Sequence, residues 1–91
     1  MKEIGYMLER NLNRGGGYNL IRVEINLFKN SEKNYYTKTK IKCGLSPKEV
    51  DKLWENGYYG KKVIDGRLLE EEVKKDGAFF GALCRVFNVY L

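Results

Sequence analysis

Polar and apolar side chains alternate along two consecutive segments of the chain. From Tyr18 to Lys29 nearly every second residue is apolar, and a second alternating segment runs from Tyr35 to Cys43. A period of two is typical of a strand with one buried face. The polar stretch 30–34 separates the two segments, so the pattern predicts an antiparallel hairpin.

One register of this hairpin makes favourable cross-strand pairs on both faces. Its opposed pairs are Lys29 with Tyr35, Val23 with Ile41, and Glu24 with Lys40. Apolar pairs on one face and an ion pair on the other both stabilise a hairpin. We therefore expect this register.

The segment from Glu3 to Leu12 also alternates, although some of its apolar residues would fit one face of a helix. Gly5 weakens the helical interpretation. The pattern favours a first strand that turns through residues 13–17 into the second and so forms a three-stranded meander. The three glycines of this turn match no phosphate-binding motif, so we interpret them as a hairpin turn.

The clearest local signal is a helix start at Ser46. Ser46 is a good N-cap, Pro47 takes the first helical position, and Glu49 completes a capping box. This helix is expected to end at Gly57. A second helix is expected to start after Asp65 and to end at 76–77.

The last segment, from Ala78 to Leu91, is rich in aromatic and β-branched residues that do not alternate with polar ones. Such a run suits a strand that is covered on both faces, and we expect a strand here. The competing interpretation is a helix whose inner face carries Phe79, Phe80, Leu83 and Phe87.

These elements predict an α+β fold. It consists of an antiparallel sheet, made of the three-stranded N-terminal meander plus a C-terminal strand, with two short helices packed on one face. At 91 residues the chain is expected to form one domain, residues 1–91. No apolar run has the length of a membrane span, and the first residues lack the features of a secretory signal, so a cytoplasmic location is expected.

The chain contains no histidine, which excludes a Ser-His-Asp triad and a zinc site of the Cys2His2 type. Cys43 and Cys84 are too far apart for a CxxC motif, and their apolar surroundings predict buried, reduced thiols. We therefore expect no catalytic residue, no metal site and no cofactor.

The whole formal net charge of +5 lies between Lys29 and Lys48, which hold six lysines and one acid, Glu32. On an extended strand, Lys38, Lys40 and Lys42 would project from one face, opposite the apolar one. Such a surface could follow a phosphate backbone. It could equally be a solvated face whose lysines keep an edge strand from pairing.

A second candidate site is the loop 57–62, in which Tyr58 and Tyr59 lie between glycines and are followed by Lys61 and Lys62. Tyrosine rings and lysines together can bind unpaired bases and phosphates. The alternative is that these tyrosines pack over Trp54.

We expect a small, basic, non-enzymatic binding protein that contacts nucleic acid or a nucleoprotein complex through the lysine-bearing hairpin. The candidate binding residues are Lys29, Lys33, Tyr36, Lys38, Lys40, Lys42, Tyr58, Tyr59, Lys61 and Lys62. The stretch lacks arginine, which favours contact with phosphates over the reading of bases.

Two other functions fit the sequence. One is a small inhibitor or adaptor, of the kind that phages and other mobile elements encode, which blocks a host protein complex by occupying its surface; tyrosines suit such an interface. The other is a metal-dependent nuclease built on Glu24, Lys40 and a further carboxylate. A homodimer is compatible with each of these functions.

Overall fold

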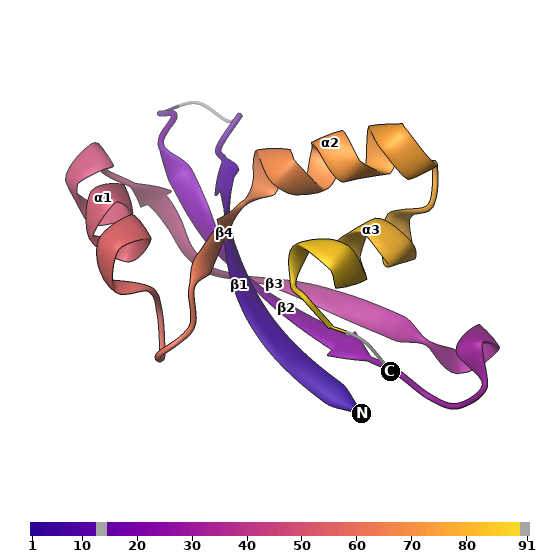
Figure 1. Cartoon of the computed structure of the whole chain (residues 1–91). Coiled ribbons are helices and arrows are strands. Elements are labelled where there is room, and N and C mark those ends of the chain that lie inside the picture. Colours follow the sequence, from indigo (N-terminus) through magenta and orange to yellow (C-terminus); the bar gives the residue numbers. More distant parts are fainter. Residues whose placement is uncertain (13–14, 90–91) are drawn as a thin grey trace.

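The computed structural model describes residues 1–12 and 15–89, which form a four-stranded mixed sheet and three α-helices (Figure 1). In chain order the elements are β1 (Lys2–Arg10), β2 (Tyr18–Asn26), a short 3-10 helix η1 (Ser31–Lys33), β3 (Tyr35–Leu45), α1 (Pro47–Asn56), β4 (Val63–Asp65), α2 (Gly66–Asp76) and α3 (Phe79–Val86). Residues 13–14 of the predicted first turn and 90–91 of the predicted last strand lie outside this description.

The strand order in the sheet is β3-β2-β1-β4. Strands β1, β2 and β3 form the antiparallel meander that the sequence predicts. The fourth strand is β4, which runs parallel to β1 beside Tyr6, Met7 and Leu8. The α+β class is confirmed, but the prediction of a wholly antiparallel sheet is wrong. A strand of three residues is too short for an alternating pattern to reveal it.

The C-terminal segment forms a helix, so the predicted last strand is wrong and the competing helix is confirmed, although Phe79 is exposed and Phe87 lies just beyond the helix end. Helix α3 buries Ala82 and Leu83 completely against the sheet and leaves Arg85 in solvent. The apolar residues of this segment therefore follow the period of a helix, and one face of that helix is covered by the sheet. Aromatic and β-branched content favours strands only weakly when tertiary packing selects a helix.

The helices cover both faces of the sheet, whereas two helices on one face were predicted. Helix α1 lies on one side and α2 and α3 on the other (Figure 1). Neighbouring residues of β1 show this division, because Met7 packs in the core beneath α2 and α3 and Leu8 in the core beneath α1. We call these the α2–α3 face and the α1 face.

The start of α1 matches its prediction in detail. The Glu49 amide donates to Ser46 Oγ and the Ser46 amide donates to Glu49 Oε1, each over 3.3 Å, which completes the capping box. Gly57 ends the helix with a φ of 72°. Helix α2 ends as predicted at Gly77, which has the left-handed conformation. Within the described residues, no helix is both long enough and apolar enough to cross a bilayer.

The register of β2 against β3 differs from the predicted one by three residues. Val23 lies opposite Lys38, not Ile41, and Glu24 lies opposite Thr37, not Lys40. The cause is at the end of β2, where Leu27 exchanges hydrogen bonds of 2.7 Å with Met1 at the start of β1. The connection to β3 is therefore longer than five residues. This odd shift in register turns the side chains of β3 from Tyr35 to Lys40 to the other face.

Candidate functional site

The three lysines of β3 do not share one face, contrary to the sequence prediction. Lys38 and Lys40 lie opposite Val23 and Ile21, and so on the α2–α3 face beside apolar residues. The register then shifts, because Ile21 pairs with Lys40 and Leu20 pairs with Lys42. This β-bulge inserts one residue into β3 and places Lys42 on the α1 face.

Most of the candidate residues on the α2–α3 face are engaged within the molecule. The ammonium group of Lys38 pairs with the Glu9 carboxylate at 2.7 Å, which offsets its charge. The ring of Tyr36 packs against Phe79 and Phe80 of α3, with centroid distances of 5.1 and 6.4 Å. Tyr36 is therefore a packing residue that joins β3 to α3.

The remaining lysines of the charged stretch are exposed at other places. Lys40 makes no ion pair with any residue in 1–12 or 15–89. Lys29 and Lys33 lie in the connection before β3, at the opposite end of that strand from Lys42. Because β3 is an edge strand, its lysines also discourage pairing with another chain.

The predicted pair between Glu24 and Lys40, on which the nuclease hypothesis depends, is absent. Glu24 pairs instead with Lys2 at 2.8 Å and Arg22 at 3.6 Å, and the hydrogen bond from Lys2 lowers the pKa of Glu24. The described part of the chain holds no group of three or more His, Cys, Asp or Glu side chains that could bind a metal ion.

The cysteines differ from their prediction in one case. Cys43 is exposed, and it lies on the edge strand within a second irregularity of the register, between Lys42 and Leu45. Cys84 is partly buried against the core, and burial raises its pKa. A neutral, partly buried thiol matches the predicted role of Cys84 as a small apolar residue.

The structure brings the two candidate sites together at Lys42. The Lys42 ammonium lies 5.9 Å from the centroid of the Tyr58 ring. Tyr58 contacts Tyr6 and Tyr59 edge to face, with centroid distances of 4.9 and 4.7 Å. Burial of the Tyr58 hydroxyl raises its pKa, with a smaller contribution from Tyr59. We call Lys42, Tyr58 and Tyr59 the tyrosine–lysine surface.

The ring of Tyr6 packs beneath this surface. The sequence does not indicate that Tyr6 belongs to the site. Tyr6 is only 8% exposed, whereas Tyr59 at the other end of the cluster is 78% exposed. Nothing in the local pattern around Tyr6 indicates this role. Its contact with Tyr58 depends on the parallel pairing of β4 with β1, which places the turn at 58–61 beside the sheet.

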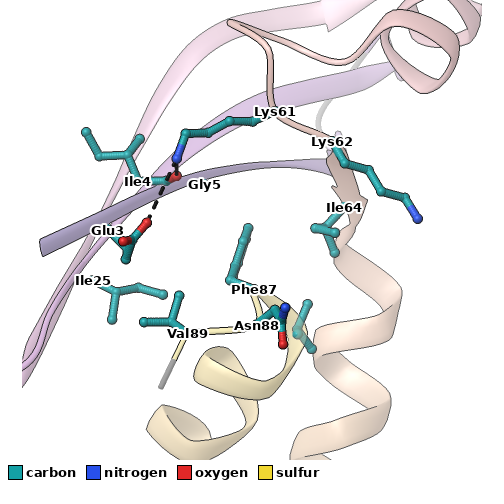
Figure 2. Close-up of a pocket in the computed structure, with 11 residues that line it drawn as sticks. Glu3, Ile4, Gly5, Ile25, Lys61, Lys62, Ile64, Phe87, Asn88 and Val89 are labelled. Carbon is teal, nitrogen blue, oxygen red and sulfur yellow. Dashed lines mark hydrogen bonds and ion pairs between the residues drawn. The ribbon is translucent and has the colours of Figure 1, made fainter. Parts of the chain in front are cut away.

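Lys61 and Lys62 do not act as a pair, although they are neighbours in the sequence. Figure 2 shows the Lys61 side chain lying along β1, where Nζ donates to the Ile4 carbonyl oxygen at 2.7 Å, and the Lys62 side chain pointing away from it. Lys61 also lies 4.0 Å from Glu3. Lys61 thus holds the turn against the sheet, and Lys62 is exposed.

Beneath Lys61 is a pocket of ≈ 480 Å³ between the free edge of β1 and the end of α3 (Figure 2). Its apolar wall is formed by Ile25, Ile64, Val86, Phe87 and Val89. Among the described residues that line this pocket, Glu3 is the one acidic side chain, and Lys61 and Lys62 are the two lysines. They form no cluster of groups suited to acid–base catalysis.

A separate apolar groove follows the outer edge of β4. Trp54 of α1 and Leu68 of α2 line a cavity of ≈ 270 Å³ together with Lys62, Val63, Ile64 and Asp65. Trp54 is 39% exposed and Leu68 50% exposed. The predicted packing of Tyr58 and Tyr59 over Trp54 does not occur, because Tyr58 packs on Tyr6 instead.

Comparison with protein families, with curated proteins and with solved structures finds no match for this chain.

Proposed function

We propose that this protein is a non-enzymatic binding protein that contacts the phosphate backbone of a nucleic acid, free or in a nucleoprotein complex, through the tyrosine–lysine surface. The observation that supports the proposal is the position of Lys42 over Tyr58. Two segments that are separate candidates in the sequence meet there, and they supply a cation and aromatic rings at one place.

The charges of the described residues favour this surface over the rest of β3. Lys38 is paired with Glu9, and Lys40 lies on the other face of the sheet. Lys42 projects beside exposed aromatic area and makes no ion pair within the described ranges. An ammonium group attracts phosphate as a point charge and reads no base, so this contact is independent of nucleotide sequence.

Charge reversal at single positions tests the proposal. Binding of a fluorescent oligonucleotide of mixed sequence is measured by anisotropy over a series of salt concentrations. Lys42→Glu is expected to weaken binding by about tenfold and to lower the slope of log affinity against log salt by about one, because one phosphate contact is lost. Wild-type affinity should fall steeply with salt.

Lys38→Glu is the matched control, because it changes the net charge by the same amount on the same strand. We expect it to leave affinity within about twofold of the wild type, since Lys38 lies on the α2–α3 face, away from the tyrosine–lysine surface. Equal losses in both variants would mean that only net charge matters and would contradict the assigned surface. Absence of salt-dependent binding by the wild type would refute nucleic-acid binding itself.

A second candidate function, a protein inhibitor or adaptor, is favoured by the groove along β4. Exposed tryptophan and leucine side chains on either side of an unpaired strand edge are typical of a protein-binding surface. Lysines protect the β3 edge, whereas the groove at the outer edge of β4 is mostly apolar and has one lysine, Lys62, and one acid, Asp65, in its wall. A partner that occupied this groove would leave the tyrosine–lysine surface free.

Affinity purification from nuclease-treated host lysate tests this second candidate. The wild type should retain a stoichiometric protein, the Trp54→Ser/Leu68→Ser variant should lose it, and Lys42→Glu should retain it. Equal recovery of that protein by wild type and the groove variant would rule out the groove as its binding site.

A further inference from the structure

The tip of the tyrosine–lysine surface is a two-residue turn with an unusual residue at its first central position. The Tyr58 amide donates to the Lys61 carbonyl oxygen at 2.8 Å, and the Lys61 amide donates to the Tyr58 carbonyl oxygen at 3.0 Å. The central residues, Tyr59 and Gly60, have φ of 48° and 72°. Turns with two positive φ angles strongly prefer Asn-Gly.

Tyrosine is a costly choice at this position. A bulky side chain at positive φ is an outlier, since its Cβ crowds the backbone, and such strain is found most often at functional sites. Its ring is also 78% exposed, so burial of apolar area does not offset the strain. The turn would be more stable with asparagine at residue 59.

The exposed ring is nevertheless held in place. Its edge-to-face contact with Tyr58 has an interplanar angle of 82°, and Tyr58 makes a similar contact with the buried ring of Tyr6. The hydrogen bond from Lys61 Nζ to the Ile4 carbonyl oxygen fixes the turn to β1. A ring that is ordered before binding loses little conformational entropy when a flat group stacks on it.

We propose that Tyr59 stacks on an unpaired nucleobase, so that the tyrosine–lysine surface prefers single-stranded nucleic acid to duplex. This inference rests on the proposed function, and it names the form of nucleic acid that the same surface binds. A base in a single strand can expose its flat face to an aromatic side chain, whereas a base inside a duplex is covered by its neighbours. Lys42, over the adjoining Tyr58, is placed to contact the backbone next to that base.

The preference is expected to be independent of base identity, because every base has a π-face. Among the described residues, the tyrosine–lysine surface carries no paired hydrogen-bond donors and acceptors that would distinguish one base from another by its edge. DNA and RNA single strands share the required chemistry, and parallel measurements with oligothymidylate and oligouridylate show which of them binds more tightly.

The test compares three probes of equal length by fluorescence anisotropy: oligothymidylate, the same strand with abasic sites throughout, and a DNA duplex. Wild-type protein is expected to bind oligothymidylate about 5- to 150-fold more tightly than the abasic strand, the range that one stacked base supplies. The duplex, whose bases are covered by their neighbours, should bind less tightly than oligothymidylate.

Tyr59→Asn is the decisive variant, because asparagine suits a positive φ and should keep the turn folded. We expect it to raise the melting temperature and to abolish the preference for oligothymidylate over the abasic strand, while its salt dependence stays as in the wild type. Tyr59→Phe should keep the preference, since the ring face is retained.

The outcomes separate this inference from the proposed function. Salt-dependent binding that is equal for all three probes would overturn the stacking inference and leave phosphate binding intact. No salt-dependent binding to any probe would overturn both. A lower melting temperature for Tyr59→Asn would show that the ring is retained for stability, which also contradicts the inference.

Discussion

Gly5 lies in the middle of β1, directly against the ring of Phe87. A Cβ atom at residue 5 would overlap the Phe87 ring, so the end of α3 can approach the sheet only where the strand has no side chain. Glycine in a strand usually weakens it, and here it marks a close approach between two elements. The same contact places Phe87 in the wall of the pocket in Figure 2.

Gly5→Ala is therefore expected to lower the free energy of unfolding by about 1–3 kcal/mol, the usual cost of overpacking a core. Gly81→Ala is the control, because the nearest atoms to its new Cβ would be at 3.5 and 4.0 Å, in ordinary contact. As the third residue of α3, alanine should stabilise the protein by up to about 1 kcal/mol. Chemical denaturation measures both, and a Gly5→Ala variant as stable as the wild type would contradict the packing assigned to Phe87.

At the level of single elements, the sequence predicts a helix or strand when the residues that determine it are close together in the chain. The start of α1 is predictable because Ser46, Pro47 and Glu49 act on one another within one turn. The meander is predictable because a period of two needs only the strand itself. Segment 78–91 is not, since a continuous apolar run is compatible with either a covered strand or a helix, and the choice depends on the sheet against which it packs.

The candidate site, too, can be predicted from the sequence only where its cause is local. The residue types that form it, lysines with tyrosines in 57–62, are recognisable in the sequence. Their arrangement is not, because the bulge beside Lys42 and the hydrogen bonds of Leu27 to Met1 involve pairings between strands. A change of one residue in such a pairing moves a side chain to the other face, and here it separates Lys42 from Lys38 and Lys40.

At the level of the whole molecule, three carboxylates stabilise the native state through a strand-to-strand ion pair or a helix cap. Glu24 of β2 pairs with Lys2 of β1, Glu49 caps α1, and Asp65 at the end of β4 caps α2. The hydrogen bond from Lys2 lowers the pKa of Glu24, and hydrogen bonds from Ser46 lower that of Glu49. Hydrogen bonds with Arg67 lower the pKa of Asp65.

Folding therefore becomes less favourable in acid. With native pKa values lowered from 4.5 for the two glutamates and 3.8 for Asp65, the unfolded chain binds more protons than the native one as the pH falls through this range. The stabilisation is fully present above about pH 5 and is lost progressively as the pH drops through the native pKa values. Urea denaturation between pH 7 and pH 3 should show a steadily falling free energy of unfolding.

Glu49→Gln isolates one contribution to this acid dependence, because glutamine can complete a capping box but does not titrate. The variant should lose less stability between pH 7 and pH 3 than the wild type does. Glu55→Gln, at an exposed residue in the last turn of the same helix, makes the same change of charge away from the cap. It should follow the wild-type curve. A Glu49→Gln curve parallel to that of the wild type would show that the capping box contributes nothing to the acid sensitivity of the fold.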